Sequence, residues 1–219
     1  MDIDLIKSYL QDSDPQKRMK AILELRQHDK EVAVPLLIEK MNDDEFLVRS
    51  FVAMGLRRTQ NAESFARLLE MMKFDRDPNV RAEAANSLSY YGDVSVSHLL
   101  LMFKQDEHWL VRRSILAALA ELNAASELLE VALIGIAGDD FSVMDSSIDC
   151  LGLLSNTEQA QQALAALLPL VDDPGWRIRL RVAKALSRFD QPSAKEALKK
   201  LKEDPDHRVV GAVLDGLVE

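Results

Sequence analysis

The chain of 219 residues contains a single cysteine, Cys150, so no disulfide can form within it. A lone thiol is typical of a protein kept in a reducing compartment. Aromatic residues make up only 5% of the chain, and there are just seven prolines and eight glycines. The apolar 47% must therefore come mainly from Leu, Ala, Val and Ile, which pack well along helices.

Positive charge is also scarce. Lys and Arg total 27 against 36 Asp and Glu, which gives a net charge of -9. Nucleic acids and anionic membranes both select proteins with clustered positive charge. We therefore expect neither nucleic acid nor a membrane among the partners.

Long hydrophobic runs are absent as well. The apolar stretches "VALIGIAG" and "LAALLPLV" are too short to cross a bilayer. The first residues, "MDIDLIKSYLQD", are acidic where a signal peptide would be basic. The sequence thus predicts a cytoplasmic protein without membrane insertion.

The sequence also lacks the common catalytic motifs. It has no Gly-rich phosphate loop, no Gly-x-Ser-x-Gly, no His-Glu-x-x-His and no second cysteine for a Cys-x-x-Cys site. The four histidines share no ligand spacing, so no metal site is expected. Cys150 is interpreted as a small buried packing residue rather than a nucleophile. No catalytic residue is assigned, and whether the protein is an enzyme stays open.

A repeated pattern fills the chain instead. Arg81 is followed three, four and seven residues later by Ala84, Ala85 and Leu88, which form one buried stripe of a helix. The same pattern follows six other positions, two of which lack the arginine: Arg18, Arg49, Arg112, Met144, Arg179 and Val210. The last copy consists of Val213, Leu214 and Leu217. Successive origins lie 31 to 35 residues apart, which predicts a solenoid of stacked helix pairs.

The turn before each second helix is acidic. An aspartate stands six residues before each of the five arginines: Asp12, Asp43, Asp75, Asp106 and Asp173. Aspartate suits the start of a helix because its carboxylate accepts free backbone N–H groups. An arginine just inside that helix can reach the aspartate of its own or the neighbouring turn, with bidentate geometry. We expect partly buried pairs of this kind, with Arg81 and Arg112 bound to carboxylates such as those of Asp75 and Asp106.

These features predict an all-α, right-handed α-solenoid of about seven short helix pairs. It should start at Ile3 and form a single domain over residues 1–219.

Two segments, "DPNVRAEAANSL" and "DPGWRIRLRVAKAL", combine an Asp-Pro turn with an early arginine and an alanine-rich helix. This combination resembles HEAT repeats, although the period is shorter than the roughly 40–47 residues usual for them. The short form is similar to the HEAT-like repeats of the phycobilin lyase family, and the resemblance covers essentially the whole chain. It implies a crescent that handles open-chain tetrapyrroles (bilins) or the phycobiliproteins that carry them, such as phycocyanin.

The chain looks most like the single-chain relatives linked to phycobilisome degradation, because it is compact and carries no appended domain. The resemblance then implies a phycobilisome-associated turnover protein that assists chromophore detachment. Three other interpretations stay open: a subunit of a bilin-attaching lyase, a protein-protein scaffold with no small ligand, and a nucleic-acid-binding protein. The net charge and the lack of interleaved aromatic residues oppose the third.

We expect the exposed face of the second helices to line the concave, ligand-binding side. Along this face the residues are apolar in the second repeat and basic in the sixth. No cofactor is required, but the resemblance implies a phycocyanobilin-type ligand, which is flat and carries two propionates. Candidate contacts are an apolar platform, acceptors for pyrrole N–H groups and cations for the carboxylates: Phe51, Met54 and Tyr90; Asn86 and Asp149; and Arg177, Arg181, Lys184 and Arg188. In the alternative interpretation, Phe51 and Met54 belong to the core and the basic residues form a solvated face.

Overall fold

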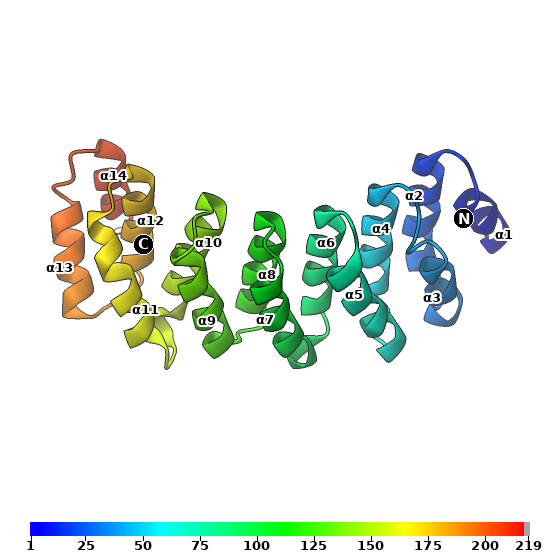
Figure 1. Cartoon of the computed structure of the whole chain (residues 1–219), viewed down its shortest axis with the longest axis horizontal. Helices are drawn as coiled ribbons and strands as arrows, with labels where there is room; N and C mark the ends of the chain where they lie inside the picture. The colour runs from blue at the N-terminus through cyan, green and yellow to red at the C-terminus, as the bar shows by residue number, and fades with distance from the viewer. Residues whose placement is uncertain (217–219) are drawn as a thin grey trace. The chain divides into compact units, whose positions relative to one another are not determined.

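The computed structural model describes residues 1–216, which form helices and turns without any strand. Helices alternate between the first and the second member of a pair (Figure 1). The first helices are α1 (Ile3–Leu10), α3 (Lys30–Ile38), α5 (Ala62–Phe74), α7 (Val96–Gln105), α9 (Ala125–Ile136), α11 (Ala160–Leu167) and α13 (Pro192–Leu201). The second helices are α2 (Pro15–Glu24), α4 (Phe46–Leu56), α6 (Pro78–Ser89), α8 (Trp109–Glu121), α10 (Phe141–Leu153), α12 (Trp176–Leu186) and α14 (His207–Asp215).

Four short 3-10 segments lie in the connections: η1 (Leu25–Gln27), η2 (Gly92–Ser95), η3 (Leu154–Asn156) and η4 (Leu168–Asp172). The predicted α-solenoid of helix pairs, beginning at Ile3, is confirmed within the described range. No helix in that range is long and apolar enough to span a membrane.

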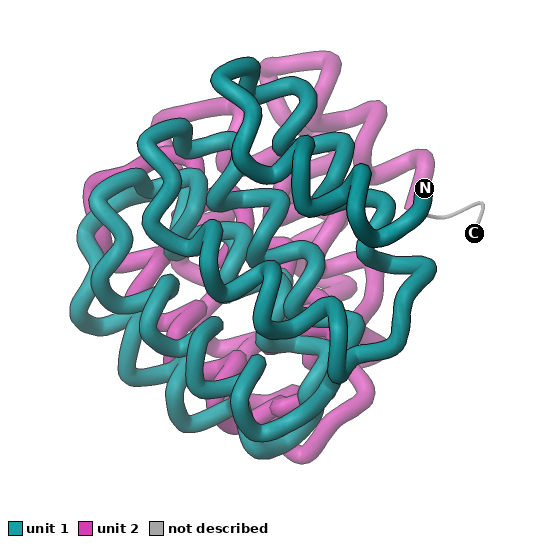
Figure 2. The backbone as a smooth tube through the Cα atoms, turned by 90° about the vertical axis from the view of Figure 1, so that its right-hand side faces the viewer, with its two compact units in different colours: residues 1–118 teal, residues 119–219 magenta. Residues whose placement is uncertain are grey.

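The chain divides into two compact units, Met1–Ala118 and Leu119–Glu219, coloured separately in Figure 2. We call them the N-terminal and the C-terminal unit. In the N-terminal unit, α4 packs between α2 and α6. In the C-terminal unit, α12 packs between α10 and α14. Within each unit the second helices therefore form a continuous layer, and first helices such as α5 and α9 pack against α6 and α10.

The predicted apolar stripe faces the layer of first helices and forms the core. Ala84, Ala85 and Leu88 of α6 are fully buried, as are the corresponding residues of α12. The last copy differs, because Leu214 is 45% exposed. No further helix follows α14 within the described residues to cover it. Leu217 lies outside the described residues.

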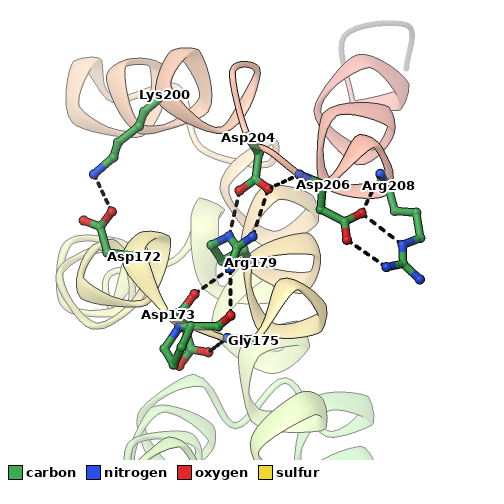
Figure 3. Close-up of polar contacts among 9 residues, drawn as sticks. Asp172, Asp173, Gly175, Arg179, Lys200, Asp204, Asp206 and Arg208 are labelled. Atoms are coloured by element: carbon green, nitrogen blue, oxygen red, sulfur yellow. Dashed lines mark hydrogen bonds and ion pairs between the residues drawn. The ribbon is translucent and has the colours of Figure 1, made fainter.

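The arginines inside the second helices connect neighbouring turns. Arg49 donates from Nε and Nη2 to the two carboxylate oxygens of Asp75, 26 residues further on, at 2.7 and 2.9 Å. Its Nη1 donates to the backbone oxygen of Asp43, six residues before it, at 2.7 Å. The same arrangement recurs in Arg18–Asp43, Arg81–Asp106 and Arg179–Asp204, the last of which is drawn in Figure 3. We call these four contacts the arginine ladder.

The ladder decides between the two turns that the prediction left open for Arg81. Arg81 binds the carboxylate of Asp106, whereas Asp75 in its own turn offers only its backbone oxygen. Arg112 likewise donates to the backbone oxygen of Asp106 at 2.7 Å. The carboxylate of Asp106 is already occupied by Arg81, so within the N-terminal unit Arg112 has no carboxylate partner.

Each ladder aspartate is also fixed by its own turn. Asp75 accepts the backbone N–H of Asp77 at 2.9 Å, and Asp204 accepts that of Asp206 at 2.9 Å. In α6 and α14 the second acid of the turn caps the helix: Asp77 for α6 and Asp206 for α14. The first aspartate is thereby oriented toward the arginine of the preceding repeat.

Candidate functional site

The predicted contact residues all lie on second helices or directly after them. In the N-terminal unit, Phe51 and Met54 lie on α4, Asn86 lies on α6 and Tyr90 ends that helix. In the C-terminal unit, Asp149 lies on α10, Arg177, Arg181 and Lys184 lie on α12, and Arg188 follows it. None of these side chains is fully buried, and Phe51 and Met54 are half-buried rather than core residues. The ligand-binding face predicted from the second to the sixth repeat includes residues of both units and stays a prediction.

In the C-terminal unit, four of the predicted residues surround one hollow of about 300 Å³. It is lined by Asp149 and Leu153 from α10 and by Arg181, Lys184, Ala185 and Arg188 from α12 and the residues after it. We call it the α10–α12 hollow. The two helices approach closely there because residue 152 is glycine: a Cβ at Gly152 would lie 3.0 Å from the Cα of Ala185. Leu153 is 47% exposed and gives the hollow an apolar contact surface.

Arg181 is neutralised by two carboxylates of the neighbouring helix. Its Nε lies 2.8 Å from Asp145 Oδ1, and its Nη1 lies 2.8 Å from Asp149 Oδ2. The predicted basic residues of the sixth repeat are therefore not all available to a ligand. Among the residues that the structure describes, none forms an ion pair with Arg177, Lys184 or Arg188.

The same contact changes the expected role of Asp149. One of its oxygens already accepts a hydrogen bond from Arg181, so that oxygen is committed within the protein. Burial raises the pKa of the Asp149 carboxyl and Asp145 adds to the shift, while Arg181 acts in the opposite direction. An uncharged Asp149 would leave the cations of the hollow with less internal compensation.

The sequence analysis did not pair Asp145 with Arg181. The usable signal was the spacing of four between Asp145 and Asp149, which places both carboxylates on one side of α10. Which helix that side faces depends on the packing of α10 against α12, which the spacing alone does not give.

A second feature, also missed, lies at the start of α12. The guanidinium carbon of Arg208 lies 3.3 Å from the ring centre of Trp176, and that of Arg177 lies 5.4 Å away. Arg208 comes from α14 and is held by Asp206 through bonds of 2.9 and 2.7 Å (Figure 3). Cations over an indole face are stabilised by the ring quadrupole. This end of α12 therefore carries a fixed aromatic and cationic cluster.

The N-terminal unit also places an arginine against one of its predicted residues. The guanidinium carbon of Arg57 lies 4.8 Å from the ring centre of Tyr90, which is 53% exposed. One face of the ring is thus covered by Arg57. Tyr90 keeps enough exposed surface to contact a ligand or partner.

Another hollow in this unit, about 400 Å³, was not predicted. Its floor is formed by apolar residues such as Leu25 and Leu37, and its rim carries Arg26, Lys30 and Arg58. The acids Asp29 and Glu31 line the same rim. Charges of both signs therefore surround this hollow, and it shows no preference for an anion or a cation.

Cys150 is buried, with 6% of its surface exposed, as its interpretation as a packing residue requires. Burial raises the pKa of its thiol to about 12, so almost no thiolate is present at neutral pH. Within the described residues, no group of three His, Cys, Asp or Glu side chains gathers in a way that could hold a metal ion. In the C-terminal unit, the α10–α12 hollow places cations beside an exposed leucine.

Comparison with known proteins gives a family and a fold. A family profile described as HEAT repeats matches residues 34–120 and 129–217. The Escherichia coli protein YibA aligns over 100% of this chain and 93% of its own, with 15% identity and a TM-score of 0.64. No curated protein matches the chain in sequence.

Two further solved structures are similar. The CpcE–CpcF complex of phycocyanin lyase from Nostoc sp. PCC7120 has 18% identity and a TM-score of 0.55, covering 100% of this chain and 87% of that one. Human deoxyhypusine hydroxylase has 19% identity and a TM-score of 0.50, covering 98% and 94%. At such identities these likenesses establish the fold alone. The profile covers most of the sequence and the structure shows the expected stacked helix pairs, so the chain belongs to the HEAT-repeat family.

Proposed function

We propose that this protein binds phycobiliproteins such as phycocyanin, or their bilin chromophore, on the exposed face of its second helices, and that it acts in phycobilisome turnover. The observation that carries the proposal is the α10–α12 hollow, which combines cations, a carboxyl group and an exposed leucine. The similarity in fold to a phycocyanin lyase complex and the short HEAT repeats support it.

The hollow suits a ligand that is apolar and carries carboxylates. Lys184 and Arg188 are exposed and form no ion pair with any residue from 1 to 216, so they are available to propionate groups. Leu153 offers an apolar contact next to them. Arg181 contributes less than its position in the stripe suggested, because Asp145 and Asp149 compensate its charge.

Cys150 is buried and the pKa of its thiol is raised, so we assign it no part in the chemistry of the chromophore bond. A bilin is attached through a thioether on a cysteine of the target protein, so a protein of this kind can act by orienting the chromophore and its target. Assisted detachment would then depend on binding geometry, and the affinity for bilin becomes the first quantity to measure.

A titration with free phycocyanobilin, followed by visible absorbance, tests the bilin part of the proposal. We expect a saturable spectral change with the native chain and a weaker one with Lys184→Glu/Arg188→Glu, a substitution that leaves the Arg181 contacts in place. The matched control is Lys199→Glu/Lys202→Glu, which changes the net charge equally at two exposed positions outside the hollow. No spectral change with the native chain, or equal changes with all three proteins, would contradict binding of bilin in the hollow.

A scaffold without a small ligand is the second candidate function. The observation that favours it is the cluster of Trp176, Arg177 and Arg208, whose members do not line the hollow. Tryptophan and arginine are the residues most enriched at the energetic centres of protein interfaces. Binding of neither phycocyanin nor free bilin would contradict the first function and leave this one.

A further inference from the structure

One side of α12 carries a row of four cations. Arg177, Arg181, Lys184 and Arg188 follow one another at spacings of four, three and four residues, which places them along the same side of a helix. The row is about 16 Å long, since each residue of a helix adds 1.5 Å. Like charges at this spacing repel one another, so the row is costly unless opposite charges lie nearby.

Among residues 1–216, only one member of the row forms ion pairs, although Asp149 also attracts Lys184 and Arg188 without pairing with them. Arg181, in the middle, is held by Asp145 and Asp149. Arg177 on one side and Lys184 and Arg188 on the other remain without an ion pair among residues 1–216. In a chain of net charge -9, such a concentration of cations is a local exception.

The row ends at the aromatic cluster. Trp176 precedes Arg177 and is half-buried, and Arg208 from α14 lies over its ring. Asp206 fixes the guanidinium of Arg208. This surface has a defined direction. Trp176 is held in place at one end, and the row of cations leads away from it.

We propose that this surface, formed by Trp176, Arg177, Lys184 and Arg188, recognises an acidic segment of a partner polypeptide. The inference rests on the proposed function only in that the partner is a protein, and it specifies which part of the partner is bound. A fully extended segment advances about 3.3 Å per residue, so about six residues are enough to follow the row. Their carboxylates pair with Arg177, Lys184 and Arg188, while Arg181 keeps its internal partners.

Charge complementarity favours a short carboxylate segment over nucleic acid. Asp145 and Asp149 lie beside the middle of the row, and Asp206 lies at its aromatic end. These acids would repel a continuous phosphate backbone, which needs a long, purely basic track. In an extended peptide successive side chains point to opposite sides, so some carboxylates can face the free cations while the others point away from the acids.

Trp176 provides a reporter at the site itself. The chain has two tryptophans, and the other, Trp109, lies on α8 in the N-terminal unit. In a Trp109→Phe background, the emission of Trp176 can be titrated at low ionic strength with capped hexaglutamate and, as the neutral control, capped hexaglutamine. We expect a saturable change with hexaglutamate alone, because only the charged peptide pairs with the row.

Charge reversal then locates the binding. In the same background, Lys184→Glu/Arg188→Glu should weaken binding of hexaglutamate by about tenfold or more, a size expected from losing exposed ion pairs and replacing them with repulsion. Lys199→Glu/Lys202→Glu on and after α13 changes the net charge equally and should weaken binding much less, because neither lysine belongs to the row or lines the α10–α12 hollow. Circular dichroism must show an unchanged helix content for each variant.

The outcomes separate this inference from the proposed function. Binding of hexaglutamate without any binding of phycocyanin supports the inference and contradicts the proposed function. Binding of phycocyanin that is equally tight in Lys184→Glu/Arg188→Glu, with no response to hexaglutamate, overturns the inference and leaves the proposed function. A tighter response to a short oligothymidylate than to hexaglutamate also overturns it, in favour of nucleic acid.

Discussion

At the scale of single residues, the contact between α9 and α10 depends on one glycine. A Cβ at Gly135 on α9 would overlap the hydroxyl of Ser147, which is fully buried on α10. Gly135→Ala should therefore lower the free energy of unfolding by about 1–3 kcal/mol, the usual cost of overpacking a core. Urea denaturation measures this change directly.

The control is a helical glycine with free space around it. A Cβ at Gly211 on α14 would meet nothing within 4 Å, so Gly211→Ala should be neutral or stabilise by up to about 1 kcal/mol. The Ser147 hydroxyl finds no hydrogen-bond partner among the described residues, so Gly135→Ala should cost less in a Ser147→Ala background. Equal stability of Gly135→Ala and the native chain would contradict the packing argument.

The thiol of Cys150 gives a second prediction at this scale. Burial raises its pKa to about 12, so a thiol reagent at pH 8 should react with the native chain far more slowly than with a free thiol. In denaturant, Cys150 should be labelled as fast as free cysteine. Fast labelling of the folded chain would contradict a packing role and restore Cys150 as a candidate nucleophile.

At the scale of elements, the arginine ladder connects successive second helices. Arg49 is 4% exposed and binds Asp75, so Arg49→Ala leaves a buried carboxylate without its partner. We expect a loss of about 3 kcal/mol or more in the free energy of unfolding. Arg67→Ala removes an exposed pair with Glu70 and should cost about 0.5 kcal/mol or less. Equal losses in the two variants would make the ladder energetically unimportant.

The ladder also sets a dependence of stability on pH. The bidentate contact with Arg179 holds the pKa of the Asp204 carboxyl below its ordinary value, against an opposing effect of burial. The folded chain therefore binds this proton at lower pH than the unfolded chain does. The stability from this pair is complete above the unfolded pKa and is lost as the pH falls through the folded one.

Asp204→Asn tests that sign. The variant should be less stable than the native chain at pH 7, and the difference should shrink as the pH falls below about 4, where the unfolded chain takes up the proton. The midpoint of urea denaturation, measured for both proteins from pH 7 to pH 3, gives the difference in stability at each pH. A difference that grew on acidification would contradict the direction of the shift.

The buried positions of each second helix were predictable from the sequence because every repeat buries the same positions. The apolar residues three, four and seven positions after Arg81 had to be buried together, and they are. The choice of ladder partner was not predictable in the same way. Arg81 was within reach of aspartates in two turns, and only the stacking of α6 on its neighbours decides that the carboxylate of Asp106 is bound.

At the scale of the whole molecule, the charge distribution is the informative property. A net charge of -9 excludes a generally basic surface, yet α12 carries four cations in a row. The sequence identified that row but not its internal compensation, because Asp145 and Asp149 belong to the preceding repeat and their orientation depends on tertiary packing. The hollow itself depends on the close approach at Gly152, which no periodic pattern specifies.

The central claim is that the exposed side of α12 binds an acidic protein partner, with phycocyanin as the proposed one. The most direct test is isothermal titration of phycocyanin into the native chain, Lys184→Glu/Arg188→Glu and Lys199→Glu/Lys202→Glu at low and high salt. We expect binding to the native chain that weakens with salt. It should be lost in Lys184→Glu/Arg188→Glu and retained in Lys199→Glu/Lys202→Glu. No binding to the native chain, or equal affinity in all three proteins, would contradict it.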